Sequence, residues 1–157
     1  ARRVLVASAI AGGAKLIIAD EPTPGLHPEV AKETFRHLRE LADLGSGVML
    51  ITHDIATAVE VADDIAVFYA GTVVEVAPAK DFTGKGELLR HPYSKALWNA
   101  LPQNEFAPVA GFQPRQTQTH EGCFFYPMCT IKSIDCLGKE PEMRNVRDGK
   151  VRCRHAT

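Results

Sequence analysis

Two adjacent carboxylates, Asp20 and Glu21, follow an apolar run that has the pattern of a strand. The run extends from Leu16 to Ala19, and Pro22 ends it. Such an uninterrupted run predicts a strand in the middle of a sheet, buried on both faces. Parallel sheets carry their chemistry just beyond the carboxyl ends of their strands. Asp20 and Glu21 are therefore candidates for handling a phosphate-bound metal and an attacking water, or they merely solvate and cap a strand end.

A second polar pair, His53 and Asp54, follows a second apolar run at residues 48–52. Between the two runs, a helix is predicted from Pro28 to about Leu44, with one apolar face. A strand, helix and strand of this length predict two parallel strands. Both polar pairs then lie at one edge of the sheet, where His53 can reach a ligand bound over Glu21. The alternative for His53 alone is a histidine beside a helix cap without a further role.

Two more strands are predicted at residues 64–69 and 71–76, around a tight turn at Ala70 and Gly71. The second strand alternates apolar and polar residues, so we expect it to be half exposed. A short helix is predicted from Pro92, and residues 104–118 have the composition of a linker. Together these patterns predict an α/β fold.

All four cysteines lie near the end of the sequence, at Cys123, Cys129, Cys136 and Cys153. This clustering predicts one small module and argues against a secreted disulfide framework. Four thiolates suit an iron-sulfur cluster or a tetrahedral zinc ion, and the lack of C-x2-C pairs favours iron and sulfur. Cysteines without a metal are the third possibility. Because the segment has few apolar residues, we expect it to be loosely held without a metal or bridges.

The overall composition gives no reason to expect nucleic acid as a partner, since the 157 residues carry a net charge of −1. No apolar run approaches the roughly 18 residues of a membrane span, and no signal-peptide pattern is present. Residues 1–11 have a helical pattern from the first residue onwards. We therefore expect the chain to be a fragment of a longer protein.

Residues 1–77 resemble the second half of the ATP-binding subunit of an ABC transporter. Residues 16–21 are similar to its Walker B strand, residues 24–27 to its D-loop and residues 51–54 to its switch-histidine loop. Residues 63–71 are similar to its closing hairpin. The resemblance implies that Asp20 helps to hold Mg²⁺ of Mg-ATP, Glu21 polarises the attacking water and His53 contacts the γ-phosphate.

The sequence departs from the family pattern in its D-loop and in the lack of two motifs. His27 stands where the D-loop usually has Asp, and Pro24 stands where a Ser is frequent. These two changes bear on how the subunit signals to its partner's nucleotide site. The G-x-x-x-x-G-K-[ST] phosphate loop and the signature motif do not occur, so we expect this fragment to be inactive alone.

The C-terminal part of the sequence resembles one group within this family, the importers of oligopeptides, dipeptides and nickel. Residues 88–97 resemble the H-P-Y-x-x-x-L tract of those ATPases, and residues 122–129 match their G-C-x-F-x-x-R-C segment except at Met128. In that group the four cysteines are associated with an iron-sulfur cluster (4Fe-4S). Zinc is the runner-up.

The resemblance implies the C-terminal half of a P-loop-type ABC ATPase sheet, with parallel strands, crossover helices and a closing hairpin. We expect three parts: the ATPase core at 1–77, a helical extension and linker at 78–118, and a four-cysteine metal-binding module at 119–157. The implied function is ATP hydrolysis that powers import of peptides or nickel, with ATP and Mg²⁺ as cofactors. The alternatives are a metal-binding or docking module with a vestigial ATPase site, and a soluble ABC ATPase outside transport.

The implied location is cytoplasmic, peripheral on the inner face of the cell membrane. The implied partners are a second ATP-binding subunit, membrane-spanning permease subunits and, indirectly, an external substrate-binding protein. No nucleic acid is expected.

Overall fold

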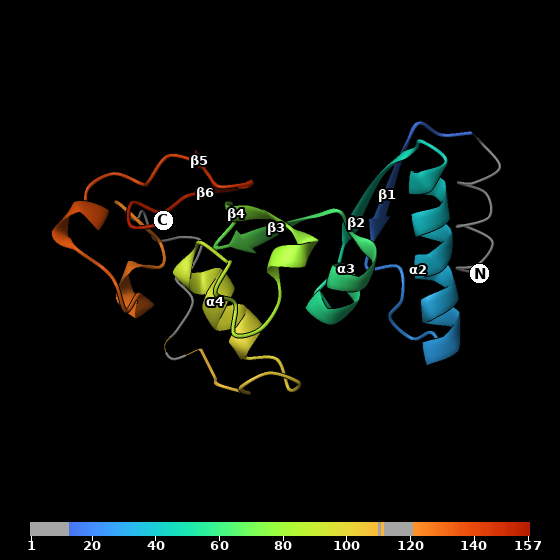
Figure 1. Cartoon of the computed structure of the whole chain (residues 1–157), viewed down its shortest axis with the longest axis horizontal. Coiled ribbons are helices and arrows are strands. Elements are labelled where there is room, and N and C mark those ends of the chain that lie inside the picture. Colours follow the sequence, from blue (N-terminus) through green and yellow to red (C-terminus); the bar gives the residue numbers. More distant parts are fainter. Residues whose placement is uncertain (1–12, 110, 112–120) are drawn as a thin grey trace. The chain divides into compact units, whose positions relative to one another are not determined.

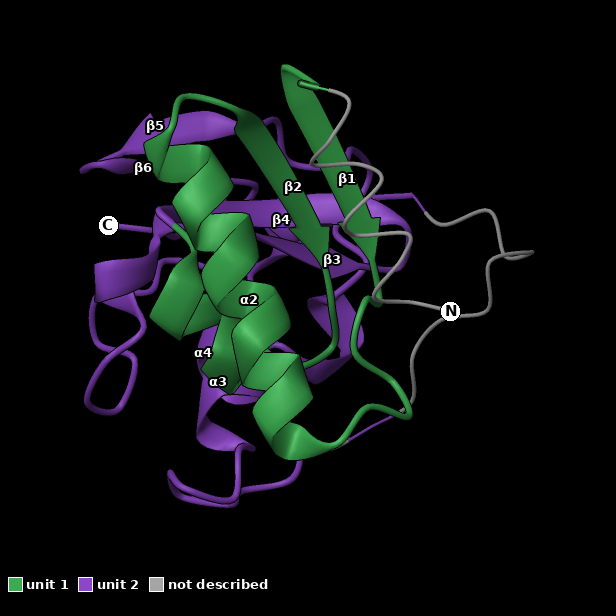
Figure 2. Ribbon diagram, turned by 90° about the vertical axis from the view of Figure 1, so that its right-hand side faces the viewer, with its two compact units in different colours: residues 1–62 green, residues 63–157 purple. Residues whose placement is uncertain are grey.

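A computed structural model describes residues 13–109, 111 and 121–157 of the chain. The chain forms two compact units, residues 1–62 and 63–157, which Figure 2 shows in green and purple. The helix predicted at residues 1–11 and most of the predicted linker lie outside the described residues. The three-part division at residues 77 and 118 stays a prediction.

The first unit contains the predicted strand, helix and strand. Strands β1 (Leu16–Asp20) and β2 (Gly47–Ile51) pair in parallel, and helix α2 (Pro28–Asp43) connects them. Helix α2 begins with Pro28, where a missing N–H costs nothing, and carries Glu29 in its first turn, near the positive end of the helix dipole. Helix α3 (Ile55–Val61) follows β2. The predicted parallel pairing of these two strands is confirmed.

One face of the β1–β2 sheet packs against helix α2. Ile17 of β1 and Phe35 and Leu38 of α2 are the buried residues of this core. On the other face, Leu16 and Ile18 are 58% and 61% exposed. Burial of these strands on both faces is therefore wrong for this structure, because within the described residues the sheet has only two strands. An apolar run alone does not tell how many layers cover a sheet.

The second unit is built on a four-stranded antiparallel sheet (Figure 1). Strands β3 (Asp64–Tyr69) and β4 (Thr72–Pro78) form the predicted hairpin, with Tyr69 opposite Thr72. Gly71 in the turn has a φ of 81°, a conformation that glycine adopts without steric cost. Strands β5 (Arg144–Val146) and β6 (Gly149–Val151) extend the sheet in the order β3-β4-β6-β5. The end of the cysteine-containing segment thus becomes part of the sheet.

Short helices surround this sheet. They are the 3-10 helix η1 (Ala79–Asp81), helix α4 (Pro92–Asn99) and the 3-10 helices η2 (Tyr126–Met128) and η3 (Ile134–Cys136). The ring of Tyr69 lies 4.5 Å from that of Tyr93 and 5.5 Å from that of Phe125, between centroids. These three rings join the hairpin, α4 and the cysteine-containing segment in one aromatic cluster. In the part of the chain that the structure describes, no helix is long and apolar enough to cross a membrane.

Strand β4 differs from the half-exposed strand that its alternation predicts. Val74, Glu75 and Ala77 are all buried, and Glu75 is fully so. The reason is that β4 lies between β3 and β6 and that the Glu75 carboxylate has hydrogen-bond donors inside the unit. A buried carboxylate with such donors costs far less than an unpaired one.

Candidate functional site

Glu21 lies directly beyond the carboxyl end of β1, where the sequence places a site. Its backbone N–H donates to the carbonyl of Ile51 at 2.9 Å, so the β1–β2 pairing extends one residue past the strand. Its φ of 42° is uncommon outside glycine and costs on the order of 1–3 kcal/mol. Such strained backbone positions cluster at functional sites.

The structure brings Glu21 and His53 into direct contact within the first unit. His53 Nδ1 lies 2.8 Å from Glu21 Oε1, and the backbone N–H of His53 donates to the same oxygen at 3.1 Å. The hydrogen bond and the negative charge of Glu21 raise the pKa of His53. His53 remains 84% exposed, so both side chains can be reached by a ligand.

Asp54 fixes the loop that carries His53. Its carboxylate accepts the backbone N–H of Thr57 at 3.1 Å and the Thr57 hydroxyl at 2.6 Å, which caps helix α3. Asp54 is thus the side-chain N-cap of α3. Asp20, one residue before Glu21, is exposed and shares a strand face with Leu16 and Ile18 because strand side chains alternate.

His27 precedes helix α2 as its N-cap, but its side chain makes no capping hydrogen bond. Aspartate is among the residues that accept such bonds well. The departure from the family pattern at His27 therefore leaves the first turn of α2 without a side-chain cap.

The four cysteines line one small cavity in the second unit. Cys123 and Cys129 are half-buried, Cys136 and Cys153 are buried, and none of the four forms a disulfide. The cavity has a volume of about 10 Å³, which is room for about one water molecule. Burial, together with the neighbouring thiols, raises the pKa values of Cys123, Cys129 and Cys153.

His155 is a neighbour of this cavity that the sequence reasoning missed. Its Nε2 lies 3.4 Å from Cys136 Sγ and 2.9 Å from Ser133 Oγ. The only signal in the sequence is the spacing Cys153-x-His155, which is too short to be specific.

The donor chemistry of four thiols suits soft metals, but their arrangement does not gather them around one ion. Among the residues that the structure describes, no group of three or more His, Cys, Asp or Glu side chains could hold a metal ion. The iron-sulfur cluster and the zinc ion expected from the sequence therefore have no support from this geometry.

The chain is similar in sequence to ATP-binding proteins of peptide transporters. A model of the family described as "Oligopeptide/dipeptide transporter, C-terminal region" matches residues 74–136. The dipeptide transport ATP-binding protein of Haemophilus influenzae is 35% identical over 97% of this chain and 47% of its own length. The corresponding Escherichia coli protein is 36% identical over 95% of this chain and 46% of its own length.

The oligopeptide transport ATP-binding protein of Mycobacterium bovis is 36% identical over 97% of this chain and 26% of its own length. The chain thus spans about half the length, or less, of the curated relatives it matches. The names of these relatives refer to dipeptides and oligopeptides, so import of nickel gains no support from them. The two alternative functions, a docking module and a soluble ATPase, gain none either.

Proposed function

We propose that this chain, whose homologues are the ATP-binding subunits of dipeptide and oligopeptide transporters, belongs to such a subunit and carries part of its hydrolytic site. The observation that supports this most is the contact between Glu21 and His53 at the carboxyl edge of a parallel strand pair. A carboxylate held beside a histidine at this edge is suited to positioning a water for attack on a phosphate.

Each polar residue at this edge has a separate role in the proposal. Bound Mg²⁺ would neutralise charge on the phosphate oxygens, and Asp20 would help to hold it. His53 contributes two donors to Glu21 Oε1, which fixes the carboxylate plane. We assign the other oxygen, Oε2, to the attacking water. We assign His53 Nε2 to the contact with a terminal phosphate.

The rest of the proposal concerns the assembly. A phosphate loop would come from another part of the longer subunit, since the G-x-x-x-x-G-K-[ST] motif does not occur in these 157 residues. The subunit would pair with a second ATP-binding subunit and dock on permease subunits at the inner face of the cell membrane. Peptides would be the transported substrates, in keeping with the relatives.

Glu21→Gln in the full-length subunit tests this function, because the change removes a charge but almost no volume. We expect ATP turnover of the reconstituted transporter to fall by a factor of at least about 100, while ATP still binds. Glu60→Gln, which removes an exposed carboxylate from helix α3, is the matched control and should keep normal turnover. Near-normal turnover of Glu21→Gln would show that another residue orients the water.

A second proposal concerns the four-cysteine cavity, because all four thiols line it although they are spread over residues 123–153. After side-chain rotation the four sulfurs would hold an iron-sulfur cluster, with zinc as the alternative. We expect anaerobically purified protein to contain iron and acid-labile sulfide, and Cys129→Ser to lose both. One zinc per chain would favour the alternative, and neither metal in fresh anaerobic protein would overturn the proposal.

A further inference from the structure

A buried ionic cluster lies in the second unit, and its three charged residues are not among those that line the cysteine cavity. Its centre is Arg90, whose side chain is 1% exposed. Arg90 Nη1 donates to Asp81 Oδ2 at 2.8 Å and lies 3.5 Å from Glu75 Oε1. Glu75 comes from β4, Asp81 from η1 and Arg90 from the segment before α4. Three elements therefore meet at one guanidinium.

Glu75 also fixes the backbone that leads into helix α4. Its Oε1 accepts the backbone N–H of Arg90 and its Oε2 that of His91, both at 2.8 Å. The two amide donors offset the second negative charge, since one guanidinium faces two carboxylates. Breaking such a buried group of charges leaves an unpaired charge inside the protein, which costs much more than an exposed pair is worth.

The same guanidinium reaches the end of the cysteine-containing segment. Arg90 Nε donates to the backbone carbonyl of Val146, at the end of β5, at 2.7 Å. A Cβ on Gly149, at the start of β6, would lie 2.8 Å from Arg90 Cζ, so the β5–β6 hairpin closes directly over the guanidinium. Strand β6 in turn pairs with β4, with Val151 opposite Glu75.

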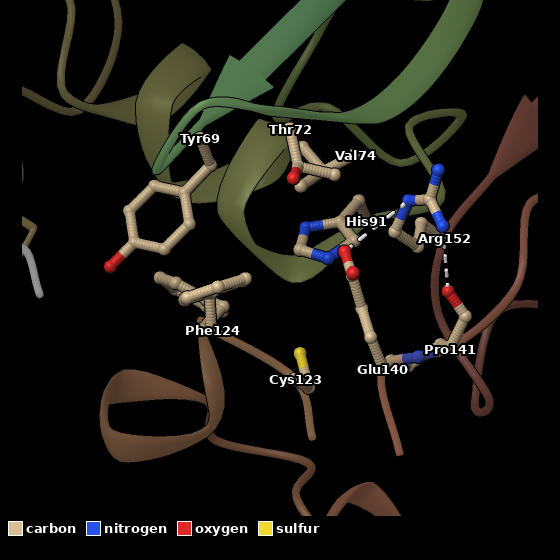
Figure 3. A pocket seen from close by; sticks show the side chains of 10 residues that line it. Tyr69, Thr72, Val74, His91, Cys123, Phe124, Glu140, Pro141 and Arg152 are labelled. Atoms are coloured by element: carbon tan, nitrogen blue, oxygen red, sulfur yellow. Dashed lines mark hydrogen bonds and ion pairs between the residues drawn. The ribbon is translucent and has the colours of Figure 1, made fainter. Parts of the chain in front are cut away.

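Arg152, the residue after β6, makes a second connection to the same sheet. Its backbone N–H and its Nε donate to the carbonyls of Val74 and Val73, at 2.8 and 3.1 Å. Its Nη1 donates to the carbonyl of Pro141 at 3.1 Å, and its Nε lies 3.6 Å from Glu140 Oε1 (Figure 3). The segment thus contacts β4 through backbone pairing and through two arginines.

We propose that Arg90, with Glu75 and Asp81, is an internal lock that holds residues 121–157 on the β3–β4 hairpin whether or not the cysteines bind a metal. The lock goes beyond the proposed ATPase and does not depend on it. It replaces the expectation that the segment is loosely held without a metal. Arginine is needed because its planar group supplies donors in several directions at once, whereas lysine offers a single point charge.

Hydrogen exchange of β5 and β6 in the full-length subunit measures the lock directly. In Arg90→Met we expect these amides to exchange at least about tenfold faster, because the Glu75 and Asp81 charges lose their partner. Arg147→Met is the matched control, since Arg147 is an exposed residue of the same hairpin that donates to the Leu88 carbonyl. It should change exchange by less than about threefold.

Removing any bound metal tests whether the lock depends on metal binding. We expect chelator-treated protein, and protein with all four cysteines changed to serine, to keep wild-type exchange in β5 and β6 within about threefold. Loosening by chelation equal to that of Arg90→Met would overturn the proposal, as would an Arg90→Met protein with unchanged exchange. If Arg90→Met does not fold, Arg90→Lys is the second variant, and the lock requires it to be looser than Arg147→Lys.

Discussion

Two histidines show how opposite environments set the charge of the same side chain. His53 is exposed beside Glu21, and the hydrogen bond and charge of that carboxylate raise its pKa. His91 is buried beside the ring of Phe125, and burial lowers its pKa from 6.5 to about 4. The first histidine can carry a positive charge toward a phosphate, whereas the second is a neutral part of the core.

The buried His91 makes the second unit sensitive to acid. Its folded pKa lies below its unfolded value of 6.5, so the unfolded chain takes up a proton first as the pH falls. The neutral His91 side chain contributes its full stabilisation above about pH 6.5, and this stabilisation is lost as the pH falls toward 4. The expected loss of unfolding free energy between pH 7 and pH 5 is about 2 kcal/mol. The fluorescence of Trp98, the single tryptophan, reports this in urea titrations.

His91→Asn is the control for this pH dependence. His91 Nδ1 accepts the backbone N–H of Tyr93 as the N-cap of α4, and asparagine can accept the same bond without titrating. The variant should show a flatter dependence of stability between pH 7 and pH 5. An unchanged slope would mean that another group takes up the proton on unfolding.

At the scale of elements, the local signals of the sequence predict most of the structure of the first unit. The apolar run before Asp20, Pro28 at a helix start and the apolar run before His53 predict β1, α2 and β2 in parallel order. The contact of Glu21 with His53 follows from that order. The exposure of the other face of the sheet could not be predicted in this way. The residue types of a strand do not show whether another layer covers that face.

The second unit is less predictable because its decisive pairings are distant in the chain. Strand β6 pairs with β4 through residues that are 74 and 76 positions apart, and β5 and β6 have only three residues each. Glu75, in an alternating strand, has the pattern of an exposed residue, and only its donors Arg90 and His91 reveal why it is buried. Pairings between distant segments leave little trace in local periodicity.

At the scale of the whole molecule, the two candidate sites lie in different compact units. Glu21 and His53 belong to residues 1–62, and the four cysteines belong to residues 63–157. The contacts described above that fix each site come from residues of its own unit. Each site can therefore be changed and tested without altering the residues that build the other.

The last prediction concerns binding and hydrolysis of ATP by the isolated chain of 157 residues. The chain has the carboxylate edge, but its sequence has no G-x-x-x-x-G-K-[ST] motif, whose backbone amides and lysine surround the phosphates of bound nucleotides. Asp20 and Glu21 repel a polyanion, and one exposed histidine offsets little of that repulsion in water. We expect calorimetry with Mg-ATP to give no binding tighter than about 1 mM, and no hydrolysis above background.

The full-length subunit under the same conditions is the reference for that measurement. Micromolar affinity of the isolated chain would contradict the expectation and would locate a phosphate site within these residues. Weak binding by the chain with tight binding by the full-length subunit would mean that affinity comes from the phosphate cradle. Glu21 and His53 would then act on ATP that is already bound, which is the order that water-positioning residues require.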